Sequence, residues 1–200
     1  MTEENNLAIH DRIMPASRAH RLDDPERLRF LPPDAVLHSL RLKAGMVVAD
    51  IGAGTGYFSV PIATAILPGG KVFAADIQQG MQALLRTKLQ RAGGPHNVEL
   101  VLAPAHTTTL AAASCDLVFV ANVWHELPDH FAALNEFRRI LKPGGTLAIL
   151  DWRPDVDHPP GPPIEHRIPA EEVCRNLSAN GFSSQEPFHV GTYSYMVLAV

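Results

Sequence analysis

The residues with the clearest chemical potential are a glycine-rich segment and an acidic residue that follows it. Asp50 precedes Gly52, Gly54 and Gly56 at the point where an apolar run ends. Glycines in such a turn let the backbone approach a ligand closely, and the N–H groups at the start of a following helix are free to donate hydrogen bonds. Asp76 ends the next apolar run, where a carboxylate can accept both hydroxyls of a ribose. The pair predicts a nucleoside-type site, with Asp50 placed to bind a cationic amine.

The spacing of the glycines distinguishes between nucleotide ligands. A dinucleotide loop has the pattern G-x-G-x-x-G, whereas here Tyr57 stands three residues after Gly54 and the third glycine comes one residue early, at Gly56. No lysine follows Gly56, so the phosphate loop of nucleoside triphosphate enzymes is disfavoured as well. An NAD(P)-dependent oxidoreductase remains an alternative interpretation, and a glycine turn without a ligand is a weaker one because Asp76 is correctly placed.

The elements that must position these residues follow from an alternation of short apolar runs with helical patterns. Buried parallel strands have this continuous apolar character, and helices connect them. We expect strands over 46–51, 71–76, 98–103, 117–121 and 146–151, and helices over 57–67, 81–92 and 131–141. Right-handed crossovers then give an α/β fold with a doubly wound, mostly parallel sheet and helices on both faces.

The two ends of the chain have a different texture. Residues 171–180 predict a short helix, and 188–191 with 194–200 predict a terminal hairpin that completes a seven-stranded sheet with an antiparallel C-terminal strand. Five prolines between 154 and 163 predict a long surface loop, which we expect to enclose a ligand. We interpret residues 1–40 as an N-terminal cap or lid and 41–200 as the main domain, within one compact domain overall.

Composition and charge exclude several classes of protein. The chain has 200 residues, of which 46% are apolar and 19% charged, as in an ordinary globular domain. No apolar stretch approaches the roughly 18 to 20 residues of a membrane span, and the first ten residues lack the features of a secretory signal, so we expect a cytoplasmic protein without membrane partners. A net charge of -4 without a basic run disfavours nucleic acid as a partner. The two cysteines form no CxxC pair, which excludes a disulfide scaffold or zinc ribbon.

The glycine-rich segment at 48–58, Val-Ala-Asp-Ile-Gly-Ala-Gly-Thr-Gly-Tyr-Phe, resembles the first motif of class I S-adenosylmethionine-dependent methyltransferases. Further segments resemble later motifs of these enzymes in the same order, and together they are similar to a small bacterial and archaeal branch of the superfamily. These segments are 22–27, 74–77, 115–119 with 122–127, 141–147 and 162–168. The resemblance extends from Leu22 to Val200 and implies a class I, Rossmann-like fold, with S-adenosylmethionine as cofactor and S-adenosylhomocysteine as product.

The resemblance assigns roles to the first motif. It implies that Gly52, Ala53 and Gly54 lie beneath the methionine part of the cofactor, with Asp50 near its amine. Gly56 belongs to the same set of cofactor-binding residues.

Later motifs supply the other cofactor contacts. The resemblance implies that Asp76 holds the ribose hydroxyls, Ile77 packs on adenine and Asn122 lines the methyl-transfer site. The family commonly places an acidic residue after the third strand to receive the adenine amino group, whereas this chain has Ala-Pro-Ala-His at 103–106. Either a backbone carbonyl or His106 takes that role.

Methyl transfer from a sulfonium is an in-line displacement that needs an aligned acceptor and, for some acceptors, a base. His125 follows the fourth strand and has the right side chain for proton removal near neutral pH, although a structural histidine is an equal interpretation. His166, with Glu165 and Arg167, is the second candidate: a base, an orienting carboxylate and an anion-binding group, or else a solvated loop. No metal is expected, because the ten histidines form no HxxxH or HExxH spacing.

The acceptor is predicted to be a small organic or sulfur-containing molecule. The fourth strand lacks the Asn/Asp-Pro-Pro-Tyr pattern that the superfamily uses for amines of nucleic-acid bases, and no thiols cluster for arsenite. A non-catalytic sensor that binds the cofactor remains a further alternative. The oligomeric state and the atom that receives the methyl group are left open.

Overall fold

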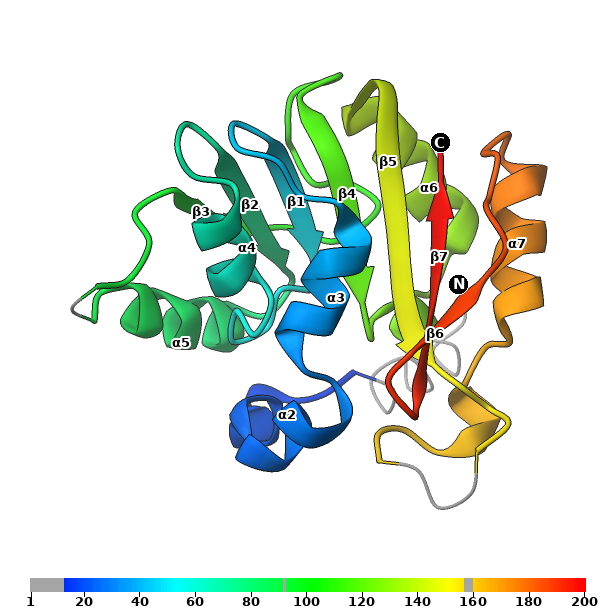
Figure 1. Ribbon diagram of the computed structural model, residues 1–200, viewed down its shortest axis with the longest axis horizontal. Helices are drawn as coiled ribbons and strands as arrows, with labels where there is room; N and C mark the ends of the chain where they lie inside the picture. The colour runs from blue at the N-terminus through cyan, green and yellow to red at the C-terminus, as the bar shows by residue number, and fades with distance from the viewer. Residues whose placement is uncertain (1–12, 92, 157–159) are drawn as a thin grey trace.

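The computed structural model describes residues 13–91, 93–156 and 160–200, which form one sheet covered by helices on both faces (Figure 1). The first twelve residues of the predicted cap and residues 157–159 of the predicted proline-rich loop therefore lie outside the described residues. Within the described residues, no helix is long and apolar enough to cross a membrane.

The sheet has seven strands in the order β3-β2-β1-β4-β5-β7-β6. Their bounds are β1 Val47–Ile51, β2 Lys71–Asp76, β3 Val98–Leu102, β4 Cys115–Ala121, β5 Leu141–Trp152, β6 Phe188–Val190 and β7 Ser194–Ala199. The first five strands are parallel, and β7 is antiparallel to both of its neighbours, β5 and β6. The predicted doubly wound, mostly parallel sheet with an antiparallel C-terminal strand is confirmed. β7 is fully buried between β5 and β6, and the short strand β6 forms the edge of the sheet.

Side chains that alternate along the strands supply two apolar layers. On one face, α4 (Ser59–Ala65) and α5 (Gln79–Leu89) pack against β2 and β3, and α3 (Pro33–Leu40) joins the same apolar layer, with Val36 and Ile62 fully buried. On the other face, α6 (His130–Ile140) packs against β5 and α7 (Ala170–Ala179) packs against β7, with Phe137 and Leu177 fully buried. Burial of strands on both sides explains why they read as continuous apolar runs.

The start of β5 differs from the prediction. Cys115 on β4 pairs with Leu141, but Leu117, two residues later, pairs with Thr146, five residues later. The extra residues bulge out around Gly144, whose φ of 76° suits a glycine. Pairing with β4 thus begins before the Lys-Pro-Gly-Gly segment that we expected to separate the helix from the strand.

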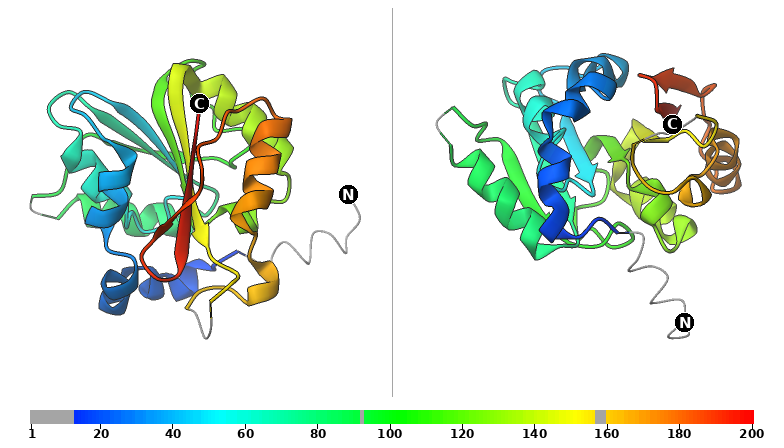
Figure 2. Two further views of the ribbon diagram at one scale, coloured as in Figure 1. Left: turned by 45° about the vertical axis from the view of Figure 1, so that its right-hand side comes forward. Right: turned by 90° about the horizontal axis from the view of Figure 1, so that it is seen from below.

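The carboxyl ends of the parallel strands gather several connecting segments (Figures 1 and 2). The segments η1 (Ala16–Asp23) and α2 (Pro25–Phe30) lie there, opposite the chain after β5 with η3 (Ile164–His166). Asp23 holds the N-terminal segment in place by accepting hydrogen bonds from Thr55 Oγ1 at 3.0 Å and from Lys88 Nζ at 2.7 Å.

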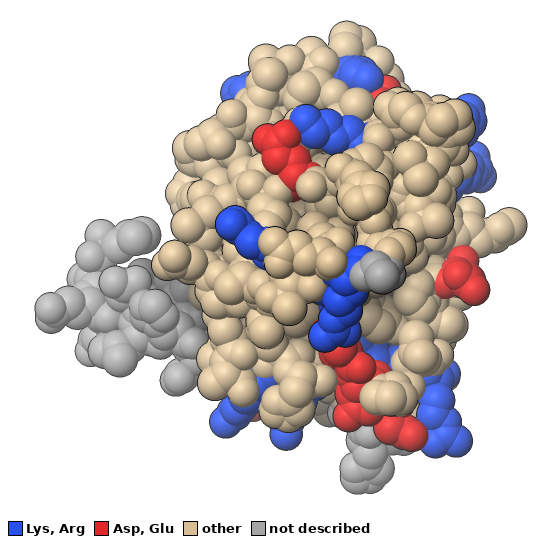
Figure 3. Space-filling model, turned by 90° about the vertical axis from the view of Figure 1, so that its left-hand side faces the viewer, with Lys and Arg blue, Asp and Glu red and all other residues tan. Residues whose placement is uncertain are grey.

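The face at the β3 edge of the sheet carries basic and acidic side chains close together among uncharged ones (Figure 3). Lys71 on β2 and Glu99 on β3 form a salt bridge, with Nζ and Oε2 2.6 Å apart. The described part of this face therefore presents no continuous basic surface of the kind that binds a polyanion.

Candidate active site

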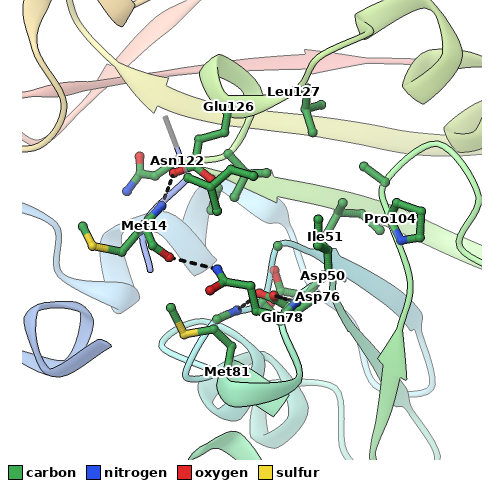
Figure 4. A pocket seen from close by; sticks show the side chains of 18 of the residues that line it. Met14, Asp50, Ile51, Asp76, Gln78, Met81, Pro104, Asn122, Glu126 and Leu127 are labelled. Atoms are coloured by element: carbon green, nitrogen blue, oxygen red, sulfur yellow. Dashed lines mark hydrogen bonds between the residues drawn. The ribbon is translucent and has the colours of Figure 1, made fainter. Parts of the chain in front are cut away.

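A cavity of about 190 Å³ opens at the carboxyl ends of β1, β2 and β4, and is called the first cavity below (Figure 4). Ligands bind at this end of doubly wound sheets. Eight of the nine predicted cofactor-binding residues line it: Asp50, Gly52, Ala53, Gly54, Asp76, Ile77, His106 and Asn122. Gly56 is absent from the described lining. A Cβ at Gly56 would lie 2.3 Å from Leu85 Cδ1, so this glycine lets α5 pack closely, and its contact with the cofactor remains a prediction.

The glycine loop is held against the ends of two strands. The N–H groups of Gly52 and Ala53 both donate to the carbonyl oxygen of Ala75, at 2.8 and 2.9 Å. Gly52 has a φ of 71°, and a Cβ on it would lie 2.3 Å from Cγ2 of Val123, which follows β4. Only glycine suits both the backbone conformation and this close approach.

Asp76 has an acceptor arrangement suited to hydroxyl groups. Its Oδ2 accepts the N–H of Gly54 and its Oδ1 accepts the N–H of Gln78, both at 2.8 Å. Each carboxylate oxygen has two lone pairs, so each can accept one further hydrogen bond from the first cavity. Burial raises the pKa of Asp76, while the two backbone N–H groups lower it.

Asp50 lies deeper, at the end of β1. Its Oδ2 accepts a hydrogen bond of 2.5 Å from Ser59 Oγ. Burial raises the pKa of Asp50 to about 6, and the Ser59 hydrogen bond and the charge of Arg27 oppose this rise. A ligand cation beside Asp50 would favour its charged form further.

Arg27 ends the 22–27 segment of the resemblance, but the motif assigned no role to it in this site. It is buried on α2, with its guanidinium carbon 4.1 Å from the centre of the Tyr57 ring, and it donates to the carbonyl of Leu22 at 3.0 Å. The local signal is the start of α2: Asp24 accepts the N–H of Glu26, and Pro25 follows the cap. That signal predicts a helix but not what the helix faces.

Asn122 supplies an unpaired polar group. It follows β4 with a φ of 56°, and both polar atoms of its amide are buried without a hydrogen-bond partner among the described residues. Buried polar atoms are rarely left unpaired. Its side chain lies at the first cavity together with Met14 and Glu126 (Figure 4), so a ligand there would satisfy it.

The outer part of the first cavity is less polar. Ile77 is 57% exposed, and Pro104 and His106 lie on the segment after β3. An apolar surface of this kind suits a planar base. The adenine contacts assigned to Ile77 and His106 remain predictions.

A second cavity of about 470 Å³ adjoins the first. It lies between the N-terminal segment, the end of β4, Trp152 and residues 160–166, and both predicted catalytic histidines, His125 and His166, line it. Six residues line both cavities: Ile13, Met14, Leu22, Arg27, Asn122 and Glu126.

His125 is held by a carboxylate from the neighbouring strand. It lies on η2 (Trp124–Glu126), is 3% exposed, and has Nδ1 2.8 Å from Oδ1 of Asp151 at the end of β5. Burial lowers the pKa of His125, but the charge and hydrogen bond of Asp151 and the charge of Glu126 outweigh it, so the pKa is raised. His125 and Asp151 thus form a buried, hydrogen-bonded pair.

The residues beside His166 have a structural function. The guanidinium of Arg167 donates to the carbonyls of Pro160, Pro162 and Arg153. Four of its five N–H donors fix the loop after β5, and its role as an anion-binding group remains a prediction. Glu165 is exposed on the same turn.

A short segment crosses between the two cavities. The side-chain amide of Gln78 accepts the N–H of Ala16 at 3.1 Å and donates to the carbonyl of Met14 at 2.9 Å. The N–H of Met14 donates to Oε1 of Glu126 at 3.3 Å, as the dashed lines in Figure 4 show. Burial raises the pKa of Glu126 to about 7 against the opposing effects of the His125 charge and the Met14 hydrogen bond.

Comparison with known proteins agrees with this geometry. Residues 49–149 match the model of a methyltransferase domain family. The chain belongs to this family. A crystal structure of an S-adenosylmethionine-dependent methyltransferase from Aquifex aeolicus superimposes with a TM-score of 0.88 and 33% identity, covering 94% of this chain and 98% of that one. The predicted class, its fold and its cofactor, S-adenosylmethionine, are thus confirmed, and the nicotinamide-dependent alternative is set aside.

Curated relatives are longer than this chain. A ubiquinone/menaquinone biosynthesis C-methyltransferase of Hahella chejuensis is 35% identical over 111 residues, which are 56% of this chain and 45% of the relative. A demethylmenaquinone methyltransferase of Listeria welshimeri is 35% identical over 112 residues, 56% of this chain and 47% of the relative. The chain therefore spans about half the length of the curated relatives it matches.

Proposed function

We propose that this protein transfers a methyl group from S-adenosylmethionine, bound in the first cavity, to a small organic acceptor in the second. The observation that carries this proposal is the shared wall at Asn122 and Glu126, which places the two cavities side by side at the end of β4. Residues before 41 act in this proposal as a cover, since Met14, Leu22 and Arg27 line both cavities.

The residues of the first cavity fit this cofactor. When bound, S-adenosylmethionine supplies a methyl group activated by a positively charged sulfur. Asp76 offers free lone pairs to the ribose hydroxyls, and Asp50 offers a negative charge to the amino group. The glycine loop allows close approach, and the unpaired amide of Asn122 gains a hydrogen-bonding partner.

The second cavity favours an acceptor with an apolar body and a polar reacting end. Phe30 and Trp152 form an aromatic wall, with ring centres 6.2 Å apart. His125 and Glu126 also line this cavity, and Glu126 lines the first cavity as well. Relatives named for methylation in quinone biosynthesis support an acceptor of this general kind.

Proton removal is assigned to His125, with His166 as the second candidate. A positioned base of this type contributes about 10²- to 10⁴-fold to a rate. His125 lies on η2 after β4, next to Glu126, which lines both cavities, whereas His166 lies on η3 and lines only the second. His125 is therefore the nearer of the two to the cofactor side.

Calorimetric titration with S-adenosylhomocysteine tests the cofactor site. Loss of a hydrogen bond to a charged group costs about 1.5 to 3 kcal/mol, so Asp76→Ala should weaken binding about 10- to 150-fold. Asp76→Asn keeps one side-chain oxygen that accepts a backbone N–H. It therefore distinguishes loss of the ribose hydrogen bonds from loss of the hydrogen bonds that hold the glycine loop. Asp116→Asn is the matched control, because Asp116 also accepts a backbone N–H but lies near the start of β4. Equal affinity in all four proteins would contradict the proposal, as would preferential binding of NAD.

Turnover distinguishes an enzyme from a sensor. Incubation with S-adenosylmethionine and a panel of phenols, thiols and amines should release S-adenosylhomocysteine, measured by mass spectrometry, with at least one member. Tight binding of the product without turnover across the panel would favour the sensor interpretation instead.

A further inference from the structure

Asp151 is a buried carboxylate that no motif singled out. It lies near the end of β5, next to β4 in the sheet, and is 1% exposed. Oδ2 accepts the backbone N–H of His125 at 2.9 Å, while Oδ1 accepts the N–H of Trp152 at 2.8 Å and lies 2.8 Å from Nδ1 of His125. The carboxylate therefore holds both the backbone and the ring of His125.

This arrangement determines which ring nitrogen is available. A carboxylate accepts hydrogen bonds, so Nδ1 carries the proton in the bond to Asp151. Nε2 is then left with its lone pair. It lies 3.9 Å from Oε1 of Glu126, beyond hydrogen-bond distance, and His125 lines the second cavity.

The charged groups around His125 come from three parts of the chain. Asp151 on β5 and Glu126 on η2 raise the pKa of His125, and Arg167, after η3, lowers it. Tyr195 of β7 pairs with Asp151 across the sheet but donates its hydroxyl to the carbonyl of Ile168, at 2.9 Å. Tyr195 therefore does not compete with His125 and Trp152 for hydrogen bonds to Asp151.

We infer that Asp151 is a positioning residue: it fixes His125 in the Nδ1–H form, so that Nε2 accepts the proton of the methyl acceptor. The acceptor's electron pair forms the bond to the methyl carbon, the carbon–sulfur bond breaks with its electrons going to sulfur, and the acceptor's proton ends on Nε2. This inference rests on the proposed function, and it adds a requirement that the function alone does not impose. The proposed function by itself does not say which ring nitrogen of His125 accepts the proton.

The tautomer of His125 can be measured directly at its ring nitrogens, in protein without cofactor or acceptor. Long-range ¹⁵N–¹H NMR spectra over a pH series give the tautomer and the titration midpoint, and the signals are assigned by their loss in His125→Gln. His130→Gln is the matched control, because His130 is a neighbour whose Nε2 lies 2.9 Å from the Trp124 carbonyl oxygen and which does not line either cavity. We expect a neutral Nδ1–H form for His125. A neutral Nε2–H form would overturn the inference.

The variant Asp151→Asn tests the source of the effect. We expect the titration midpoint of His125 to move to lower pH and the Nδ1–H preference to be lost, with S-adenosylhomocysteine binding unchanged. An unchanged midpoint in the folded variant would overturn the inference, and if the variant does not fold, the tautomer in the wild-type protein decides. Failure of the wild-type protein to bind S-adenosylhomocysteine would contradict the proposed function and is a separate result.

Discussion

Replacement of Glu126 by glutamine should change how the stability of the protein depends on pH. The side chain is 16% exposed, and burial raises its pKa to about 7 from a reference value of 4.5. The amide oxygen of glutamine can still accept the N–H of Met14. The substitution therefore removes the titration and keeps the hydrogen bond.

The sign follows from proton binding in the two states. Between pH 4.5 and about pH 7, the folded protein holds a proton on Glu126 that the unfolded chain has released, so stability falls as pH rises through this window. At about 1.4 kcal/mol per pKa unit, a difference of about 2.5 units corresponds to about 3 kcal/mol. The pKa of Asp50 is raised to about 6, so Asp50 also makes the stability fall as pH rises towards that value. The pKa of His125 is raised as well, so the stability that His125 contributes is lost as pH rises.

Urea unfolding at intervals from about pH 5 to about pH 8 measures the effect. As pH rises through this range, we expect the free energy of unfolding of Glu126→Gln to rise by about 3 kcal/mol relative to that of wild type. Glu126→Gln should be the more stable protein at the alkaline end. Glu165→Gln is the control, since Glu165 is exposed on η3. If the free energies of unfolding of wild type and Glu126→Gln changed with pH in parallel, burial would not raise the pKa of Glu126. That result would refute the reasoning.

Three further substitutions test other parts of the site. Gly52→Ala should destabilise the protein by about 2 kcal/mol or more, because a left-handed alanine is strained and its Cβ meets Val123; Val123→Ala in the same chain should restore part of the loss in thermal unfolding. His125→Gln should lower kcat about 10²- to 10⁴-fold with S-adenosylhomocysteine affinity retained, whereas His130→Gln should keep both; full activity in the first variant would exclude the base. Arg27→Met keeps an apolar stem on α2 but removes a charge that lowers the pKa of Asp50, so S-adenosylhomocysteine binding near pH 6 should weaken more than at pH 8; calorimetry at both values checks this.

Much of the fold could be predicted because its elements depend on neighbouring residues. The second strand, 71–76, has the same bounds in the structure, since an apolar run between glycines and a polar segment specifies a buried strand locally. The glycine loop and Asp76 could be predicted for the same reason: a turn with left-handed glycines and a carboxylate at a strand end are local features, and sheet topology brings them together.

The pattern did not predict features that depend on pairing between distant residues. The bulge at 142–145 arises from the register of β5 on β4, and the interior place of β7 arises from its pairing with β5 rather than from the hairpin itself. Gly56 follows the motif but packs against α5.

The sequence alone thus determined the class of the fold, the glycine loop and the candidate histidines, because each rests on residue types and short spacings. Only the tertiary structure decided what those residues contact. Asp151 reaches His125 across 26 positions, Met14 reaches Glu126 across 112, and Arg27 enters the cavity from a helix whose own pattern specifies no partner. Such contacts are set by how strands align and how the cap packs, and the energies that select them are spread over the whole core.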